Sequence, residues 1–277
     1  MENKEKREVK FELDQKTWDA IMEIKDKPIY LGDPVYRKFH SKEELMECLK
    51  SEIKRQGKNV VIRDLDVSLI EDMSWLFNVC RDIESLDLSG WKTSNVKDMS
   101  FMFNGCINLK SIDLSGWKTS NVKDMSAMFG SCINLKSIDL SGWKTSNVKD
   151  MSAMFGGCWT LESLDLSGFD TSNVENMCGT FCVCRNLKSL DLSGWDTSNV
   201  KSMSGMFYGC ENLESLDLSG WDTSNVKCMD RMFYDCENLK SLDLSGFDTS
   251  NVENMSRMFF RCPVPYKRVG KKIVRKP

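Results

Sequence analysis

The sequence predicts an α/β solenoid, a stack of coils with parallel strands on one face and short helices on the other. Three observations predict it. A 26-residue unit recurs without insertion, each unit opens with strand-like alternation of apolar residues, and each continues with helix-like spacing. Recurrence at a fixed period of roughly 20–50 residues is the signature of stacked repeats. Each unit contains one Asp and one Cys at fixed positions. The repeated Asp residues are Asp87, Asp113, Asp139, Asp165, Asp191, Asp217 and Asp243. The repeated Cys residues are Cys80, Cys106, Cys132, Cys158, Cys184, Cys210, Cys236 and Cys262.

The composition describes a folded protein with an acidic centre. Charged residues make up 29% and hydrophobic residues 41% of the chain, which is typical of a globular protein rather than a disordered one. Residues 1–57 carry 13 basic and 13 acidic side chains and the tail 263–277 carries six basic and no acidic ones, so the net charge of -3 leaves -9 on residues 58–262. An acidic body disfavours a nucleic-acid-binding protein, whose binding face is a basic stripe. The basic tail is interpreted as a solvated terminus, with contact to phosphate or a membrane surface as the alternative.

Residues 1–57 are predicted to form a helical capping region for the stack. The apolar residues Trp18, Ile21 and Met22 indicate a short amphipathic helix over 14–26, followed by turns. A capping box at Ser41 and three residues on then begins a second helix, which Gly57 ends. This second helix is expected to cover the open end of the first coil, because a stack otherwise ends in bare apolar surface. Its apolar face is Leu45, Met46, Leu49 and Ile53.

The repeat domain is predicted over residues 58–262, with a strand in each of seven full units and a helix in eight. Leu109, Ile112 and Leu114 have the spacing of a short strand with one buried face. A turn at Ser115-Gly116 and N-cap candidates at 119–121 lead into the helix. That helix is expected to bury residues at i, i+3, i+4 and i+7, which are Met125, Met128, Phe129 and Cys132. Residues 58–82 match this pattern imperfectly, as terminal repeats do.

The third region is the basic tail, 263–277. Pro263 and Pro265 follow the last repeat directly. Because proline cannot donate to a strand ladder, no further strand is expected after them.

Whole repeat units resemble those of the bacterial BspA-like leucine-rich-repeat surface proteins. A representative unit is CENLESLDLSGWDTSNVKCMDRMFYDC, from Cys210 to Cys236, and the resemblance covers about residues 58–277. It implies a leucine-rich-repeat solenoid with a binding role, commonly adhesion to host or neighbouring-cell proteins. It implies no enzymatic activity and no shared ligand residues, and we expect no cofactor. The chain departs from the family in lacking a secretion signal, and Trp or Phe stands where many other leucine-rich repeats keep a buried Asn.

The Asp of each unit is the first candidate site. Because Asp87 to Asp243 alternate with buried leucines, they are expected to face outward on the strand surface, where neighbouring carboxylates would repel one another. The functional interpretation is a basic protein ligand or bound Ca²⁺. The favoured alternative is a structural ladder bonded to adjacent Ser hydroxyls and backbone N–H groups. Ca²⁺ requires six to eight converging oxygens, which the unit does not cluster.

The repeated Cys is predicted to be a small buried hydrophobe, since a linear ladder cannot converge on zinc. Cys48, Cys178, Cys182 and Cys228 lie outside that ladder. A metal or redox cluster around Cys178, Cys182 and Cys184 is the alternative, although this is not a standard zinc spacing.

The residue after the repeated aromatic changes sign along the chain. It is Lys92, Lys118 and Lys144, then Asp170, Asp196, Asp222 and Asp248. This predicts an edge with a basic and an acidic strip, suited to a bipolar partner or to head-to-tail self-association. A solvated edge with drifting charge is the favoured alternative.

The sequence therefore predicts non-enzymatic protein–protein binding across the strand-lined face. No catalytic set is expected, because His40 is the only histidine and is interpreted as a surface residue. A metal-stabilised structural repeat and an intracellular scaffold are the alternative functions. The absence of a signal peptide, anchor or apolar span predicts a cytoplasmic location, whereas the family resemblance predicts the cell surface or secretion.

Overall fold

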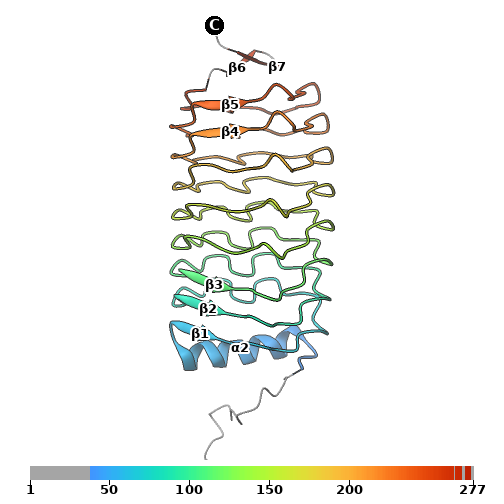
Figure 1. Ribbon diagram of the computed structural model, residues 1–277, viewed down its shortest axis with the longest axis vertical. Coiled ribbons are helices and arrows are strands. Elements are labelled where there is room, and N and C mark those ends of the chain that lie inside the picture. Colours follow the sequence, from blue (N-terminus) through green and yellow to red (C-terminus); the bar gives the residue numbers. More distant parts are fainter. Residues whose placement is uncertain (1–37, 265, 270–271, 276–277) are drawn as a thin grey trace, which may run out of the picture. The chain divides into compact units, whose positions relative to one another are not determined.

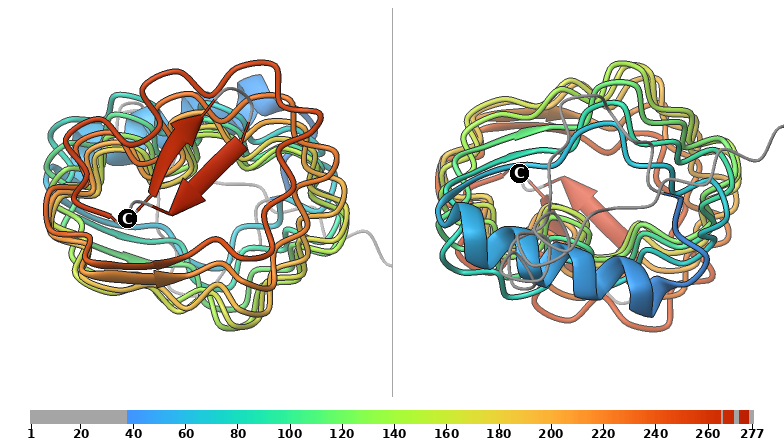
Figure 2. Two further views of the ribbon diagram at one scale, coloured as in Figure 1. Left: turned by 90° about the horizontal axis from the view of Figure 1, so that it is seen from above. Right: turned by 90° about the horizontal axis from the view of Figure 1, so that it is seen from below.

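The computed structural model describes residues 38–264, 266–269 and 272–275. In this part of the chain, 26-residue coils lie one beside the next (Figure 1) and nearly superimpose when seen along the stack (Figure 2). Their strands are parallel and in register by one repeat, as the sequence predicts. The helix predicted over 14–26 lies outside the described residues.

Parallel strands occur at both ends of the repeat domain. The first sheet contains β1 (Asn59–Val61), β2 (Ser85–Asp87) and β3 (Ser111–Asp113), and the second contains β4 (Ser215–Asp217) and β5 (Ser241–Asp243). Val60 pairs with Leu86 and Leu86 with Ile112, so each step of the ladder is one repeat. The strand prediction is wrong for the coils containing Asp139, Asp165 and Asp191, where the described backbone forms no strand. In two of those coils the inward-facing Ile138 and Leu164 are only half-buried.

The predicted short helices are wrong. Residues 125–132 form overlapping turns, and so do the equivalent residues in the other coils; we call this set the turn row. It consists of residues 73–80, 99–106, 125–132, 151–158, 177–184, 203–210, 229–236 and 255–262. Within the described residues the only helix is α2, which lies outside the repeats.

The hydrogen bonds of the turn row explain why it is not helical. Alternate N–H groups bond to the next coil, as from Met125 to the Asp150 carbonyl (3.0 Å) and from Phe129 to the Met154 carbonyl (2.9 Å). The N–H groups between them close local turns, as from Met128 to the carbonyl of Met125 (3.3 Å). A helix of about two turns is marginal on its own, whereas a neighbouring coil supplies an acceptor for every second donor. The four side chains predicted to be buried, Met125, Met128, Phe129 and Cys132, are buried all the same.

The core consists of identical residues stacked from coil to coil. The phenylalanine rings from Phe77 to Phe259 stack with centroids 5.4 to 5.9 Å apart. Buried threonines add polar links: Thr145 Oγ1 donates to the Asp170 carbonyl (2.9 Å) and accepts from the Asp170 N–H (2.8 Å). Apolar stacking and polar hydrogen bonds thus both join neighbouring coils.

Helix α2 (Lys42–Gln56) confirms the second predicted helix. Ser41 accepts a hydrogen bond from the Glu44 N–H (3.1 Å), and Gly57, with φ of 71°, donates its N–H to the Ile53 carbonyl. Leu45 and Leu49 are buried in the same core as Val60 of β1. The helix therefore covers the apolar face of the first coil.

The expectation of no strand after Pro263 is wrong. The antiparallel strands β6 (Tyr266–Val269) and β7 (Lys272–Arg275) follow it. The prolines end the repeat pattern, but a hairpin supplies its own partners and needs no further coil. Tyr266 stacks on Phe259 with ring centroids 6.4 Å apart, which continues the aromatic ladder by one ring.

Candidate binding surfaces

The repeated aspartates lie where the strand pattern predicts. We call Asp87, Asp113, Asp139, Asp165, Asp191, Asp217 and Asp243 the Asp row. Asp87 is half-buried and the other six side chains are exposed. In every case one carboxylate oxygen, Oδ1, accepts the backbone N–H of the Ser two residues later, at 2.8 to 3.1 Å. The favoured structural interpretation is thus realised for one oxygen of each carboxylate.

These hydrogen bonds favour the charged form of several members of the row. The Ser141 and Ser167 N–H groups lower the pKa of Asp139 and Asp165, respectively. The Ser193 hydroxyl has the same effect on the pKa of Asp191. A carboxylate that accepts such bonds stays ionised at neutral pH. The row is therefore a line of fixed negative charges.

The first member differs from the others. Arg63 donates from Nε to Asp87 Oδ2 at 2.6 Å. In the part of the chain that the structure describes, Asp113 to Asp243 form no such ion pair. Six carboxylates thus each keep a second oxygen for solvent or a ligand.

The edge residues that change sign are all exposed. Lys92, Lys118 and Lys144 occupy the first coils, and the four aspartates follow from Asp170 on. The Ser172 hydroxyl lowers the pKa of Asp170, and the Ser224 N–H lowers that of Asp222. The structure places the basic and acidic strips on the surface, and their role stays a prediction.

Most of the repeated cysteines are buried, as predicted. Cys106 Sγ donates to the carbonyl of Phe77 at 3.1 Å, and the equivalent contact recurs along the ladder. Burial raises the pKa of Cys106 and of Cys158 to about 12, so these thiols are uncharged at neutral pH. Cys178, Cys182 and Cys228 are half-buried, and no three His, Cys, Asp or Glu among the described residues gather as a metal ion would require. His40 is exposed.

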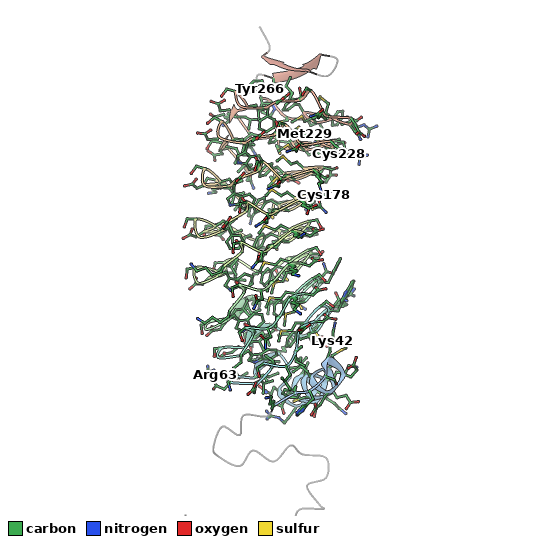
Figure 3. The ribbon with its side chains drawn as sticks, turned by 90° about the vertical axis from the view of Figure 1, so that its right-hand side faces the viewer. Lys42, Arg63, Cys178, Cys228, Met229 and Tyr266 are labelled. Atoms are coloured by element: carbon green, nitrogen blue, oxygen red, sulfur yellow. The ribbon has the colours of Figure 1, made fainter. Side chains whose placement is uncertain are left out.

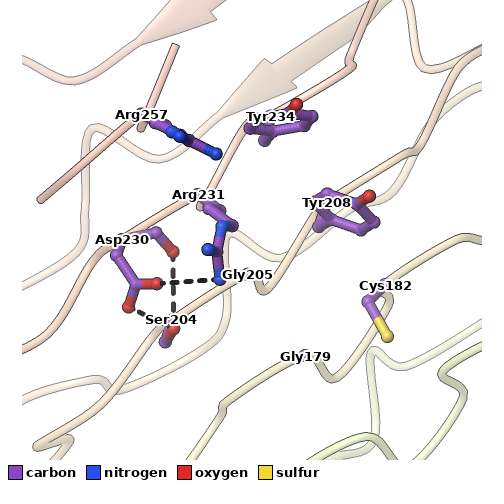
Figure 4. Close-up of a pocket in the computed structure, with 9 residues that line it drawn as sticks. All are labelled: Gly179, Cys182, Ser204, Gly205, Tyr208, Asp230, Arg231, Tyr234 and Arg257. Atoms are coloured by element: carbon purple, nitrogen blue, oxygen red, sulfur yellow. Dashed lines mark hydrogen bonds and ion pairs between the residues drawn. The ribbon is translucent and has the colours of Figure 1, made fainter. Parts of the chain in front are cut away.

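A pocket that sequence reasoning missed lies on the turn row. Its volume is about 450 Å³ and it draws residues from four successive coils (Figure 4). Figure 3 places Cys178 and Cys228 of two of these coils at the edge of the stack opposite Arg63, which follows β1. The lining residues are Gly179, Cys182, Ser204, Gly205, Tyr208, Asp230, Arg231, Tyr234 and Arg257.

Variation at two repeat positions creates this pocket. The third residue of the turn row is large in the first coil, where it is Trp75, and shrinks to glycine at Gly179 and Gly205. The residue after the buried Phe is small at Gly130 and becomes aromatic at Tyr208 and then Tyr234. The signal was present in the sequence, but only as a difference between coils at two repeat positions, which the interpretation of a single unit does not compare.

Similar proteins come from several bacteria. A leucine-rich-repeat protein of T. pallidum matches with 21% identity and a TM-score of 0.42, over 66% of this chain and 78% of that one. A leucine-rich cell surface protein of Faecalibacterium prausnitzii matches with 15% identity and a TM-score of 0.26, over 70% of each chain. A leucine-rich-repeat protein of Bacteroides ovatus matches with 18% identity and a TM-score of 0.25, over 62% of this chain and 58% of that one. All three are described as leucine-rich or leucine-rich-repeat proteins.

No curated protein matches the chain. Among the described residues, no helix has the length and apolar character to cross a membrane. A family model matches the chain twice, over residues 46–163 and 149–269, and so covers most of α2 and every coil. The chain belongs to the family described as Mycoplasma protein of unknown function, DUF285.

Proposed function

We propose that this chain is a non-enzymatic binding protein whose Asp row engages a basic surface on a protein partner. The observation that supports this most directly is the row of six exposed carboxylates, Asp113 to Asp243, without an ion-pair partner among the described residues. Adhesion to a protein of another cell is the form of binding that the family resemblance suggests. The domain arrangement proposed with it is a capping region (1–57), a leucine-rich-repeat solenoid (58–262) and a basic tail (263–277).

The geometry of the row favours recognition over random solvation. Each carboxylate is fixed through Oδ1 to a Ser N–H, so little side-chain freedom remains to be lost on binding. The aspartates occupy the same position of successive coils, and where these coils pair as parallel strands, as at Asp87 with Asp113 and at Asp217 with Asp243, the strands lie ~4.8 Å apart. The row is therefore a line of negative charge along the stack. Such a line complements lysines or arginines presented along a strand or a helix, and it steers association electrostatically.

Ca²⁺ is a weaker candidate for the same row. A calcium site requires six to eight oxygens that converge on one point. Here the carboxylates follow a line, and one oxygen of each is already bonded to the backbone.

Substitution of Asp by Asn tests the proposal without removing the structural hydrogen bond. The triple variant Asp139→Asn, Asp165→Asn and Asp191→Asn keeps an oxygen that can accept the Ser N–H but loses three charges. The matched control is Asp196→Asn, Asp222→Asn and Asp248→Asn, which removes the same charge from the edge. Binding of a fluorescent ten-residue oligolysine peptide is measured by anisotropy, with an uncharged peptide of equal length for comparison.

We expect the row variant to bind oligolysine about tenfold more weakly and the edge variant to lose less than about threefold, at ~0.1 M salt. Equal losses would mean that net charge alone attracts the peptide. Equal binding of the uncharged peptide, or no binding by the unmodified protein, would also contradict the proposal.

A further inference from the structure

We propose that the pocket on the turn row binds an acidic peptide segment of a protein partner, with a carboxylate of the peptide against Arg257 and the adjoining residue over Tyr208 and Tyr234. This goes beyond binding by the Asp row, since it concerns different residues and a ligand of opposite charge. The pocket volume, about 450 Å³, lies in the range that accommodates small groups rather than a whole protein face. A side chain or two of a peptide is an occupant of suitable size.

The charge of the pocket favours an anion. Arg257 is exposed, and among the described residues no carboxylate lies within ion-pair distance of its guanidinium. Arg231 faces Asp230 at 3.7 Å, but that carboxylate also accepts from the Ser204 hydroxyl and from the Cys228 thiol. The pocket thus has two guanidinium groups and one carboxylate, and that carboxylate pairs with Arg231 and has other donors. A planar guanidinium binds a carboxylate through two parallel hydrogen bonds.

One wall of the pocket is aromatic. The rings of Tyr208 and Tyr234 lie 5.1 Å apart between centroids, and Tyr234 stacks on Phe260 at 4.8 Å. Figure 4 shows both tyrosines beside the two arginines. Both tyrosines are half-buried, and within the described ranges neither hydroxyl has a hydrogen-bond partner. The wall therefore offers an apolar ring face and two free donors, which suits a peptide group or an aromatic residue next to the acid.

The floor of the pocket leaves room for the ligand. Gly205, with φ of 58°, occupies the third position of its turn row. Side chains are compatible with that backbone here, because Phe101 and Arg231 occupy the same repeat position with φ of 55° and 54°. Phe101 is accommodated there by stacking on Trp75 at 4.2 Å. Gly205→Phe is thus a substitution that the repeat tolerates elsewhere and that fills the pocket.

A peptide fits these features better than a small anion does. Ala153 continues the third position of the turn row toward the preceding coils, and its side chain is short. An extended peptide can continue out of the pocket along this row, whereas a small free anion would occupy the pocket alone. The carboxylate can be a Glu or Asp side chain or a chain terminus, and the two sources share the same chemistry at Arg257.

The test is calorimetric titration of the whole chain with six-residue peptides that place one Phe between two Glu. Each peptide is prepared with a free or an amidated C-terminus, and a second pair replaces both Glu by Gln. We expect the Glu peptides to bind at least tenfold more tightly than the Gln peptides. If the amidated and free peptides bind equally, the site recognises side-chain carboxylates. If the peptide with a free C-terminus binds more tightly, the site recognises chain termini. Both results support an acidic peptide.

Three variants locate the binding. Arg257→Gln is expected to weaken the Glu peptide about tenfold and to leave the Gln peptide unchanged, whereas Arg81→Gln, which removes an exposed arginine from the first coil, leaves both unchanged. Gly205→Phe is expected to abolish binding while its unfolding transition stays cooperative. Should Gly205→Phe fail to fold, Arg257→Glu provides the second measurement, with a larger loss than Arg257→Gln. The Asp139, Asp165 and Asp191 triple variant is expected to retain peptide binding.

The proposal is overturned if Glu and Gln peptides bind alike, or if Arg257→Gln behaves as Arg81→Gln does. It is also overturned if inorganic phosphate at equal concentration displaces the peptide completely and binds as tightly. A dimer in solution that Gly205→Phe converts to a monomer, without peptide binding, would assign the pocket to a second copy of the chain instead.

Discussion

Replacement of a central ring in the phenylalanine ladder tests how the stack is held together. Phe155 is buried to 1% exposure and stacks on Phe129 at 5.8 Å and on Phe181 at 5.9 Å. Full burial of a phenylalanine contributes about 1.5–3 kcal/mol, and each aromatic pair adds about 0.5–1.5 kcal/mol. Phe155→Ala is therefore expected to lower the free energy of unfolding by about 3–5 kcal/mol, which agrees with typical core truncations.

The same substitution near the end of the stack is the matched control. Phe259 is only half-buried, between Phe233 at 5.8 Å and Tyr266 at 6.4 Å. Phe259→Ala should cost about half as much as Phe155→Ala, because less apolar surface becomes exposed.

Guanidinium-induced unfolding followed by tryptophan fluorescence measures both variants. In a linear array each coil contacts only its neighbours, so a central defect should also uncouple the two halves and lower the slope of the transition. Equal losses at the two positions, or a loss below about 1 kcal/mol at Phe155, would refute a stack held by its aromatic ladder.

Three further substitutions test individual ladders. Thr145→Val removes a hydroxyl that both donates to and accepts from the Asp170 backbone, on a side chain of 1% exposure. It should lower the free energy of chemical unfolding by about 1–3 kcal/mol, whereas Ser137→Ala, at an exposed position, should leave it unchanged. No loss of stability in Thr145→Val would contradict the polar link. Trp117→Phe should lower the free energy of unfolding by about 1–3 kcal/mol, because the Leu88 carbonyl loses the indole donor at 2.9 Å. Trp195→Phe should change it by less than about 1 kcal/mol, because the Trp195 Nε1 is buried without a partner among the described residues. A larger loss in Trp195→Phe than in Trp117→Phe would contradict the hydrogen-bond assignment. The Ser68 hydroxyl and Lys92 lower the pKa of Asp66 to about 2, whereas its pKa in the unfolded chain is about 3.9. The charge of Asp66 therefore stabilises the fold fully above about pH 4, and this stabilisation is lost as the pH falls toward 2. The difference in unfolding free energy between the unmodified protein and Asp66→Asn should therefore shrink over that range, and a difference that grows on acidification would show that the sign is wrong.

Burial could be predicted from the sequence because it depends on repeat position alone. Met125, Met128, Phe129 and Cys132 recur in coil after coil, and stacking buries whichever residues recur as apolar. The backbone that carries them could not be predicted in the same way. Spacing at i, i+3, i+4 and i+7 is shared by a helix and by these overlapping turns, and the hydrogen bonds that decide between them lead to another coil.

The outward surface was predictable only in part. Alternation along the strand placed the Asp row outward, because the residues on either side of each Asp are leucines or isoleucines that are buried or half-buried. The pocket was not predictable from one unit, since Gly205, Tyr234 and Arg257 belong to three different coils. Such a site is found when equivalent positions are compared between coils, and not when a single coil is searched. The hairpin β6–β7 was missed because prolines excluded continued stacking but not local antiparallel pairing.

Zero-length carbodiimide cross-linking of the oligolysine peptide, read by mass spectrometry, tests most directly whether the Asp row is a binding surface. The reagent joins a lysine amine to a carboxylate only where the two are in contact. Binding along the row predicts cross-links at Asp113 to Asp243, and few at the equally exposed edge residues Asp196, Asp222 and Asp248. Cross-links spread evenly over both sets, or confined to the edge, would contradict it.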